Sequence, residues 1–482
     1  MNRRKFIAGG LAAGVAGLGA GKLIQKKSPI KPISVECGPY GSVTEETALH
    51  ARKAQNFATE APRHGRLQLG IAPVVVPLAG SYQSSSVGYN GTAPGPLLHV
   101  RENSPIAIDI TNATDMREMV HWHGLVVPSE VDGAEEEGTP FIAPLSTRRY
   151  TFVPRPAGLR WYHTQVAAGM DLYRGLYTGQ FGFLYVEPRN EPGLYDQEIF
   201  LALRDWEPFY VRREDPRSFT RNALRVRYSR CSINGTAFGH GEPIAVKARQ
   251  RILFHILNAS ATEEHSIALA GHRFTVTALD GNPVPRQQTV ETLRMAPGER
   301  IDAVVDMNQP GLWILGSTED QVRNKGLGLV IEYANKSGFA QWIPPEDLTW
   351  DYTRFGDAAR RPVPEEILHL SFKPTAGELG TVDKWCVNGN TYLHEIALRA
   401  GGRYRLMLHN RSNGPVPMHL HRHIFEIAAV NGRQTAGVMK DTVVVPPLGS
   451  IAADFTAQPG LSLLRSQIQN HADYGLKALI SA

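Results

Sequence analysis

An internal threefold repeat most constrains how this chain of 482 residues folds. Each copy has an Asn-Gly pair and then, 22 to 24 residues after that Asn, a second Asn that closes an apolar run. The paired asparagines are Asn90 and Asn112, Asn234 and Asn258, and Asn388 and Asn410. The copies recur at about 150 residues, which is the size of a domain rather than of a solenoid unit. The repeat therefore predicts three similar domains in series.

Each copy carries the signals of an antiparallel β-sandwich. Asn-Gly between apolar runs predicts a tight hairpin turn. The apolar residues before the second Asn alternate with other residues, which predicts a strand with one buried face. The 46 glycines and 33 prolines suit many short strands joined by turns. We predict an all-β chain of three Greek-key β-sandwich domains, at residues 65–190, 195–335 and 364–482.

The N-terminal segment has the pattern of an export address. Arg3 and Arg4 precede a Gly- and Ala-rich apolar run, and residues 1–31 hold seven basic and no acidic residues. We predict a twin-arginine signal peptide at residues 1–33, recognised by the twin-arginine translocation machinery, and a periplasmic or otherwise exported protein. A membrane anchor is the alternative, although the run is short and Gly-rich for a span of about 20 apolar residues. Removing the seven basic residues changes the net charge from +5 to −2, so no nucleic-acid partner is predicted.

The chain has three cysteines, which is an odd number for an exported protein. Cys37, Cys231 and Cys386 allow one disulfide and one free thiol, with the pairing left open. None of them lies near the C-terminal histidines, so no thiolate is available there.

Histidines are spaced in pairs that suit metal binding. His121 and His123 form one i, i+2 pair, and His419 and His421 form another. Side chains two residues apart on a β-strand point to the same face, so each segment offers two imidazoles to neighbouring metal ions. His163 lies between the two pairs in the sequence. These five histidines are the candidate metal ligands.

These motifs resemble the copper-ligand motifs of the multicopper oxidases, the family of the laccases and bilirubin oxidases. The resemblance covers essentially the whole chain after the N-terminal segment, and it implies three cupredoxin-like domains. It also implies a type 1 copper that takes electrons from a substrate, and a trinuclear copper cluster between the first and third domains. By the same resemblance, His121 and His419 are type 2 ligands, whereas His123, His163 and His421 are type 3 ligands.

Only half of the family's twelve ligand positions match. The matching residues are His121, His123, His163, His419, His421 and His471. The residues that differ are Gln165, Val416, Arg465, Ser466, Gln467 and Leu476. Ser466 takes the place of the type 1 cysteine, and its hydroxyl is a poor substitute for a thiolate. We therefore predict that type 1 copper is absent, while copper at the residual histidine site stays an open question.

Two hypotheses for function follow from this ligand set. The first is an exported multicopper-oxidase-like protein with a binding or scaffold role, without laccase turnover, whose partner is an unknown envelope protein or small molecule. The alternative is a copper-binding oxidoreductase that uses the residual type 2 and type 3 histidines. The simplest reading of the five histidines is a hydrogen-bonded polar interface that holds no metal.

Arg465 carries a separate expectation because it replaces a type 3 histidine. We expect its guanidinium to lie in the cavity between the first and third domains. We further expect it within hydrogen-bonding reach of Gln165, Gln467, His421 or Asp132, since a buried charge needs partners.

The remaining acidic and histidine residues have simpler interpretations. Asp132 stands where the family often has an acidic residue that serves the oxygen site, although a solvated acidic loop explains residues 135–137 equally well. We expect His255, His409 and His423 to be structural.

Overall fold

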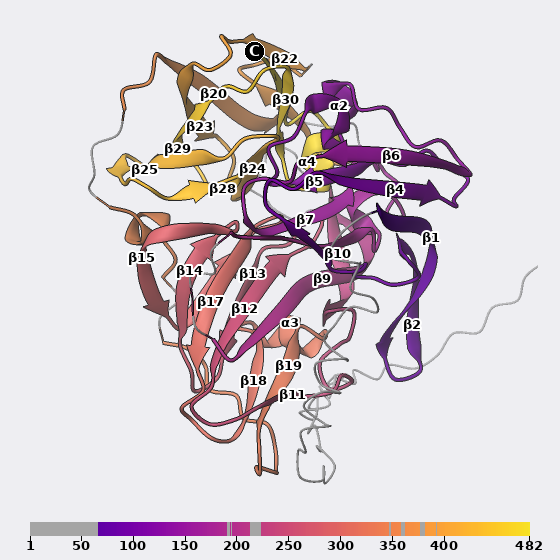
Figure 1. Cartoon of the computed structure of the whole chain (residues 1–482), viewed down its shortest axis with the longest axis vertical. Helices are drawn as coiled ribbons and strands as arrows, with labels where there is room; N and C mark the ends of the chain where they lie inside the picture. The colour runs from indigo at the N-terminus through magenta and orange to yellow at the C-terminus, as the bar shows by residue number, and fades with distance from the viewer. Residues whose placement is uncertain are drawn as a thin grey trace, which may run out of the picture. The chain divides into compact units, whose positions relative to one another are not determined.

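The computed structural model describes residues 66–189, 193, 195–212, 223–346, 349–357, 362–375, 381–391 and 393–482. The predicted signal peptide and Cys37 lie outside the described residues. Cys231 and Cys386 are both free and buried, so they do not form a disulfide with one another. The described strands form six sheets, two in each repeat (Figure 1).

The first repeat is a sandwich of two four-stranded sheets, with strand orders β2–β1–β4–β6 and β3–β8–β7–β5. Its strands are β1 (Arg66–Ala79), β2 (Tyr82–Tyr89), β3 (Leu98–Arg101), β4 (Ile106–Asn112), β5 (Val120–His123), β6 (Ser146–Phe152), β7 (Gly158–Thr164) and β8 (Phe181–Glu187). Its loops hold the short helical segments α2 (Ser129–Asp132), η1 (Glu135–Glu137) and η2 (Gly175–Tyr177). The core lies between the sheets, where Leu69 and Ile110 of one sheet share an apolar cluster with Trp122 and Leu184 of the other.

The second repeat has a six-stranded sheet, β10–β9–β12–β17–β14–β15, and a five-stranded sheet, β11–β19–β18–β13–β16. Its strands are β9 (Gln197–Arg212), β10 (Leu224–Ile233), β11 (Ile244–Val246), β12 (Arg251–Asn258), β13 (His265–Leu269), β14 (Phe274–Leu279), β15 (Asn282–Val290), β16 (Thr292–Met295), β17 (Arg300–Asp306), β18 (Leu312–Ser317) and β19 (Gly328–Tyr333). Helix α3 (Asp320–Asn324) precedes β19, and η3 (Tyr352–Phe355) lies in the connection to the third repeat.

The third repeat has the strand orders β21–β20–β23–β29–β25–β26, with β27 also on β25, and β22–β31–β30–β24–β28. Its strands are β20 (Glu366–Thr375), β21 (Lys384–Val387), β22 (His394–Ala397), β23 (Arg403–Asn410), β24 (Val416–Leu420), β25 (Phe425–Val430), β26 (Arg433–Gln434), β27 (Met439–Lys440), β28 (Thr442–Val445), β29 (Ser450–Thr456), β30 (Leu461–Ser466) and β31 (Lys477–Ser481). Helix α4 (Gln469–Asp473) follows β30. One apolar cluster contains core residues of both the second and the third repeat.

The three repeats share the same local structure at the asparagines that define them. Asn90, Asn234 and Asn388 have φ between 49° and 53°, and a glycine with positive φ follows each. This is the backbone that a two-residue Asn-Gly turn requires. The second Asn of each copy accepts a hydrogen bond from the backbone N–H two residues later. It also ends a strand that pairs in parallel with the first strand of its repeat, as β4 does with β1. The predicted all-β fold of three sandwiches is confirmed.

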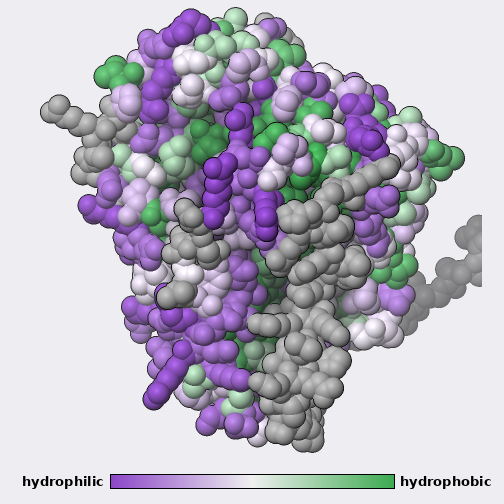
Figure 2. Space-filling view, viewed as in Figure 1, coloured by the Kyte–Doolittle hydropathy of each residue, from purple (hydrophilic) through white to green (hydrophobic). Residues whose placement is uncertain are grey.

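The exposed surface mixes hydrophilic and hydrophobic residues. Large exposed hydrophobic side chains come from many parts of the chain, among them Leu145, Tyr173, Phe339 and Val363. Figure 2 shows purple and green residues interspersed on one face. Among the described helices, none has the length and apolar character needed to cross a membrane.

Candidate metal centre

The strand pattern directs the candidate histidines toward one place between the first and third repeats. In β5, Val120 and Trp122 enter the core of the first sandwich, so His121 and His123 face away from it. In β24, Val416, Met418 and Leu420 enter the core of the third repeat, so His419 points to the opposite side. Strand β7 pairs with β5 and places His163 directly opposite His121. Figure 1 shows β5 and β7 near β24.

All five histidines that we selected from the sequence are buried and lie in one cluster. The rings of His121 and His421 stack with their centroids 3.9 Å apart, and those of His123 and His419 stack at 3.7 Å. None of the five is more than 1% exposed. Burial, followed by neighbouring imidazoles, lowers the pKa of His123, His163 and His419 well below the ordinary value. These imidazoles are therefore neutral, which is the state that ligates metals.

His121 and His419 face each other through ring nitrogens that carry no proton. Nδ1 of His121 lies 2.9 Å from the carbonyl oxygen of Asp132, and Nδ1 of His419 lies 2.7 Å from that of Asp441. A carbonyl only accepts, so in each neutral ring the proton is on Nδ1 and Nε2 holds a bare lone pair. The two Nε2 atoms are 3.2 Å apart. Two lone pairs that meet at this distance repel each other unless a cation lies between them.

His123 and His163 form a second pair of the same kind. Nδ1 of His163 donates to the carbonyl oxygen of Thr164 at 2.8 Å, which leaves its Nε2 bare. Nε2 of His123 lies 3.0 Å from a carboxylate oxygen of Asp441, which leaves Nδ1 of His123 bare. These two bare nitrogens are 3.3 Å apart. The cluster thus offers two positions at which a cation would meet two nitrogen donors.

His421 differs from the other four because a side-chain amide occupies its ring nitrogen. Its Nδ1 lies 2.9 Å from Oδ2 of Asp132, and its Nε2 lies 3.2 Å from the amide nitrogen of Gln165. Gln165, where the resemblance implies a histidine, donates a hydrogen bond to His421. This nitrogen of His421 is therefore occupied by an amide.

A buried pair of carboxyl groups lies beside His421. Asp132 and Glu137 are 0% and 2% exposed, so the solvated-loop interpretation is wrong for Glu137. Burial and the charge of Asp132 raise the pKa of Glu137 well above its ordinary value. Burial also opposes ionisation of Asp132, but His121 and His421 lower its pKa below the ordinary value. The pKa values of the two carboxyl groups are thus shifted in opposite directions, and the sequence analysis did not identify this pair.

Asp441 connects the cluster to the second repeat and was also missed from the sequence. Its carboxylate receives two hydrogen bonds from Arg300, at 2.7 and 2.6 Å, and lies 3.6 Å from Arg160. Burial alone would raise the pKa of Asp441, but the charge and hydrogen bonds of Arg300, and then His123, lower it well below the ordinary value. The partners come from all three repeats, so no local sequence pattern reveals this group.

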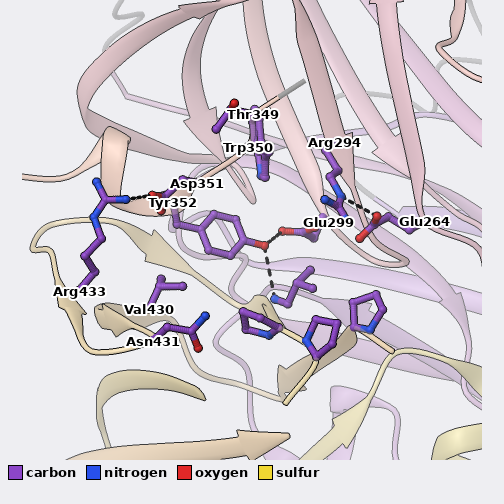
Figure 3. Close-up of a pocket in the computed structure, with 14 residues that line it drawn as sticks. Glu264, Arg294, Glu299, Thr349, Trp350, Asp351, Tyr352, Val430, Asn431 and Arg433 are labelled. Carbon is purple, nitrogen blue, oxygen red and sulfur yellow. Dashed lines mark hydrogen bonds and ion pairs between the residues drawn. The ribbon is translucent and has the colours of Figure 1, made fainter. Parts of the chain in front are cut away.

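A pocket of about 450 Å³ lies at the other end of this buried polar network, between the second and third repeats. In Figure 3 the hydroxyl of Tyr352 points to Glu299, to which it donates a hydrogen bond. The ammonium of Lys440 lies 2.9 Å from Glu299 and 3.0 Å from Asp280, whose carboxylate also accepts from the backbone N–H of Asp441. A continuous chain of polar groups therefore runs from the pocket to the histidines.

Arg465 is buried beside the cluster, but its predicted hydrogen bonds are wrong. Its Nε donates to the carbonyl oxygen of Ser466 at 3.1 Å, and one terminal nitrogen has no partner among the described residues. No described hydrogen bond joins it to Gln165, Gln467, His421 or Asp132. Two acidic groups, Asp473 and Glu136, attract the guanidinium instead, although burial lowers its pKa more strongly than they raise it. Its positive charge still lowers the pKa of His421 and His163.

The four residues for which the resemblance implies a type 1 copper site are all described: Val416, Ser466, His471 and Leu476. The hydroxyl of Ser466 is 3.5 Å from Nδ1 of His471, and the backbone N–H of Ser466 donates to the carbonyl oxygen of Leu476. Val416 and Leu476 are completely buried and belong to the apolar core. This site offers one imidazole and one hydroxyl, because valine and leucine have no donor atom.

The fold and the buried histidine pairs resemble those of the multicopper oxidases. Profiles of the multicopper oxidase family match residues 71–191, 200–331 and 360–480. The chain therefore belongs to the multicopper oxidase family, and the resemblance in the motifs is confirmed. Membership supports copper binding and oxidoreductase chemistry.

Relatives and solved structures agree with this assignment. The chain is 28% identical to multicopper oxidase MmcO of Mycobacterium tuberculosis, over 98% of this chain and 95% of that protein. It is 25% identical to copper resistance protein A of Escherichia coli, over 62% of this chain and 55% of that protein. Fet3p, a multicopper oxidase that functions in iron import, superposes with a TM-score of 0.73 over 86% of this chain and 90% of its own. Its sequence identity is 17%, so this likeness shows the fold alone.

Proposed function

We propose that this protein binds copper between its first and third repeats and does not turn over substrate as a laccase does. The observation that carries the proposal is the geometry of the bare nitrogens, which face each other 3.2 Å apart in one pair and 3.3 Å apart in the other. A neutral donor set of this kind fits copper, for which imidazole is a suitable ligand. A bound copper ion would supply one-electron redox chemistry at this site.

The surrounding residues hold the donors in place before any metal binds. The carbonyl oxygens of Asp132, Thr164 and Asp441 fix the tautomers of His121, His163 and His419. Such partners orient ligating imidazoles and raise their basicity. His421 completes the donor set only when the amide of Gln165 rotates away, because that amide occupies its Nε2.

The absence of laccase turnover is proposed from the type 1 positions. A type 1 site needs a thiolate, two imidazoles and a weak axial ligand. Ser466, Val416 and Leu476 stand at three of these positions, and only His471 is an imidazole. Arg465 and Gln467 replace the two histidines that would relay electrons from the thiolate. We therefore propose a role in binding, with an envelope protein or a small molecule as partner, after export by the twin-arginine route. The twin arginines at Arg3 and Arg4 support export.

Metal analysis of the purified full chain tests the copper half of this proposal. Protein prepared with copper should keep at least one copper ion per chain through gel filtration. The H121Q/H419Q variant should hold less copper than the wild type, whereas H240Q, a change at an exposed histidine, should hold the same amount. Copper-free wild-type protein would overturn copper binding and leave the hydrogen-bonded interface as the explanation.

An oxidase assay tests the other half. Copper-loaded protein should not oxidise a phenol or a diamine with oxygen, and no intense blue absorption should appear, since that band needs a thiolate. Copper-dependent turnover that H121Q/H419Q abolishes would overturn the proposed lack of oxidase activity and favour the copper-binding oxidoreductase.

A further inference from the structure

A second group of metal-binding side chains lies on the outer face of the third repeat. His369 of β20 and His409 of β23 meet there, with Nδ1 of His369 3.3 Å from Nε2 of His409. Their rings are almost parallel, at 6° to one another. Leu370 and Leu408, one residue away on each strand, are buried in the core, so the two histidines face outward.

Met407 adds a thioether to this pair of imidazoles. It lies two residues before His409 on the same strand and therefore on the same face. Strands β20 and β23 are parallel neighbours, and Met407 is the residue directly opposite His369. Its side chain is half-buried and packs against Ala428, Ala429 and Ala452. Two nitrogen donors and one sulfur donor thus come from adjacent positions of a rigid sheet.

The sheet leaves room beside these donors. A hollow of about 280 Å³ has His369 and Met407 in its wall. The neighbouring strands and turn contribute Ala429, Gly432 and Ala452, whose small side chains create the space. An ion held by the donors would remain open to a further ligand from solvent.

The arginine that lines the hollow is paired with a carboxylate. Arg405, on the same face, is not a free charge because it donates two hydrogen bonds to Asp454, at 2.6 and 2.9 Å.

We propose that His369, Met407 and His409 form a surface site for one soft transition-metal ion, with Cu(I) as the preferred ion. Imidazole nitrogen binds several first-row metals, and a thioether is a soft donor that suits Cu(I). Zinc sites use Cys, His and Asp or Glu rather than Met. The site shares no residue with the buried histidine cluster, so it does not depend on the proposed function. His409, expected from the sequence to be structural, becomes a ligand in this assignment.

The test is an anaerobic titration of the full chain with Cu(I) against a chromophoric Cu(I) chelator. The H121Q/H419Q variant serves as background, so that the buried cluster does not contribute. In that background, adding H369Q and H409Q should remove one Cu(I) per chain, whereas adding H240Q should not. M407L alone should weaken Cu(I) by at least roughly tenfold, since loss of even an outer-shell partner costs that much. It should leave Zn(II) affinity nearly unchanged.

Circular dichroism of each variant verifies that the exposed substitutions leave the fold intact. If the background protein and its H369Q/H409Q derivative take up equal Cu(I), the two imidazoles make only a hydrogen bond to each other and the proposal is wrong. Equal weakening of Cu(I) and Zn(II) by M407L would overturn the preference for a soft ion.

Discussion

At the residue scale, the clearest pH-dependent group is His255 in β12. Its Nδ1 lies 2.8 Å from Asp302 and its Nε2 lies 3.8 Å from Glu198. Burial lowers the pKa of His255, but the two carboxylates together raise it to about 9. A folded-state pKa above the unfolded value of about 6.5 stabilises the protein fully below pH 6.5, and this contribution is lost as the pH rises to about 9.

We therefore expect wild-type protein to lose up to about 3 kcal/mol of unfolding free energy between pH 6.5 and 9 through this residue. Chemical denaturation at several pH values measures the loss. H255Q removes the titrating group, so its stability should fall less over that range, while H240Q should follow the wild type. An unchanged slope in H255Q would contradict the assignment.

Arg465 allows a sharper test at the residue scale because one substitution removes its permanent charge and adds an imidazole, while another keeps the charge and adds no imidazole. R465H removes the permanent charge of a buried guanidinium and returns a histidine to a ligand position. It should raise the copper content per chain, since a like charge disfavours a bound cation. R465K keeps a positive charge and should not raise it. Neither variant should gain oxidase activity, because Ser466 is unchanged; equal copper in both variants would show that the charge is irrelevant.

At the element scale, one carboxylate between β27 and β28 holds strands of three repeats together. Asp441 pairs with Arg300 of β17 and lies close to Arg160 of β7, and all three are completely buried. Asp441→Asn removes a carboxylate that faces two buried guanidinium groups and leaves Asp280 as the remaining counter-charge of Arg300, so it should cost roughly 3–5 kcal/mol of unfolding free energy. D306N, at an exposed pair with Arg251, should cost less than about 1 kcal/mol. Denaturation curves measure the loss of unfolding free energy in both variants. Equal losses in the two variants would contradict the role given to Asp441.

The same elements show which features could be predicted from the sequence and which could not. Asn-Gly turns and alternating apolar residues are local signals, so the three sandwiches and the shared face of His121 and His123 were predictable. Asp441 and Glu137 act through partners hundreds of residues away, as Glu137 does when it accepts from the backbone N–H of Leu463. No local pattern encodes such a pairing. The predicted hydrogen-bond partners of the Arg465 guanidinium were wrong for a related reason. The acidic groups that attract it, Glu136 and Asp473, lie on other elements.

At the scale of the whole molecule, the histidine cluster is a contact between repeats as well as a candidate metal site. His121 and His123 belong to the first repeat, whereas His419 and Asp441 belong to the third. Without a cation the facing nitrogens of His121 and His419 repel one another, although hydrogen bonds from His421 to Asp132 and from His123 to Asp441 already join the two repeats. A metal ion that bridges them would join the repeats through bonds absent from the unfolded chain.

We therefore expect copper to stabilise the whole chain and not only its site. A ligand that binds the folded state alone adds about 2.7 kcal/mol when free ligand is 100 times its dissociation constant. Thermal unfolding of the full chain, measured with increasing copper, should show a midpoint that rises with copper concentration. The H369Q/H409Q variant should retain this rise, because His121 and His419 are unchanged in it. The H121Q/H419Q variant should lose most of it. A rise of equal size in both variants would place the stabilising ion elsewhere and contradict copper binding between the first and third repeats.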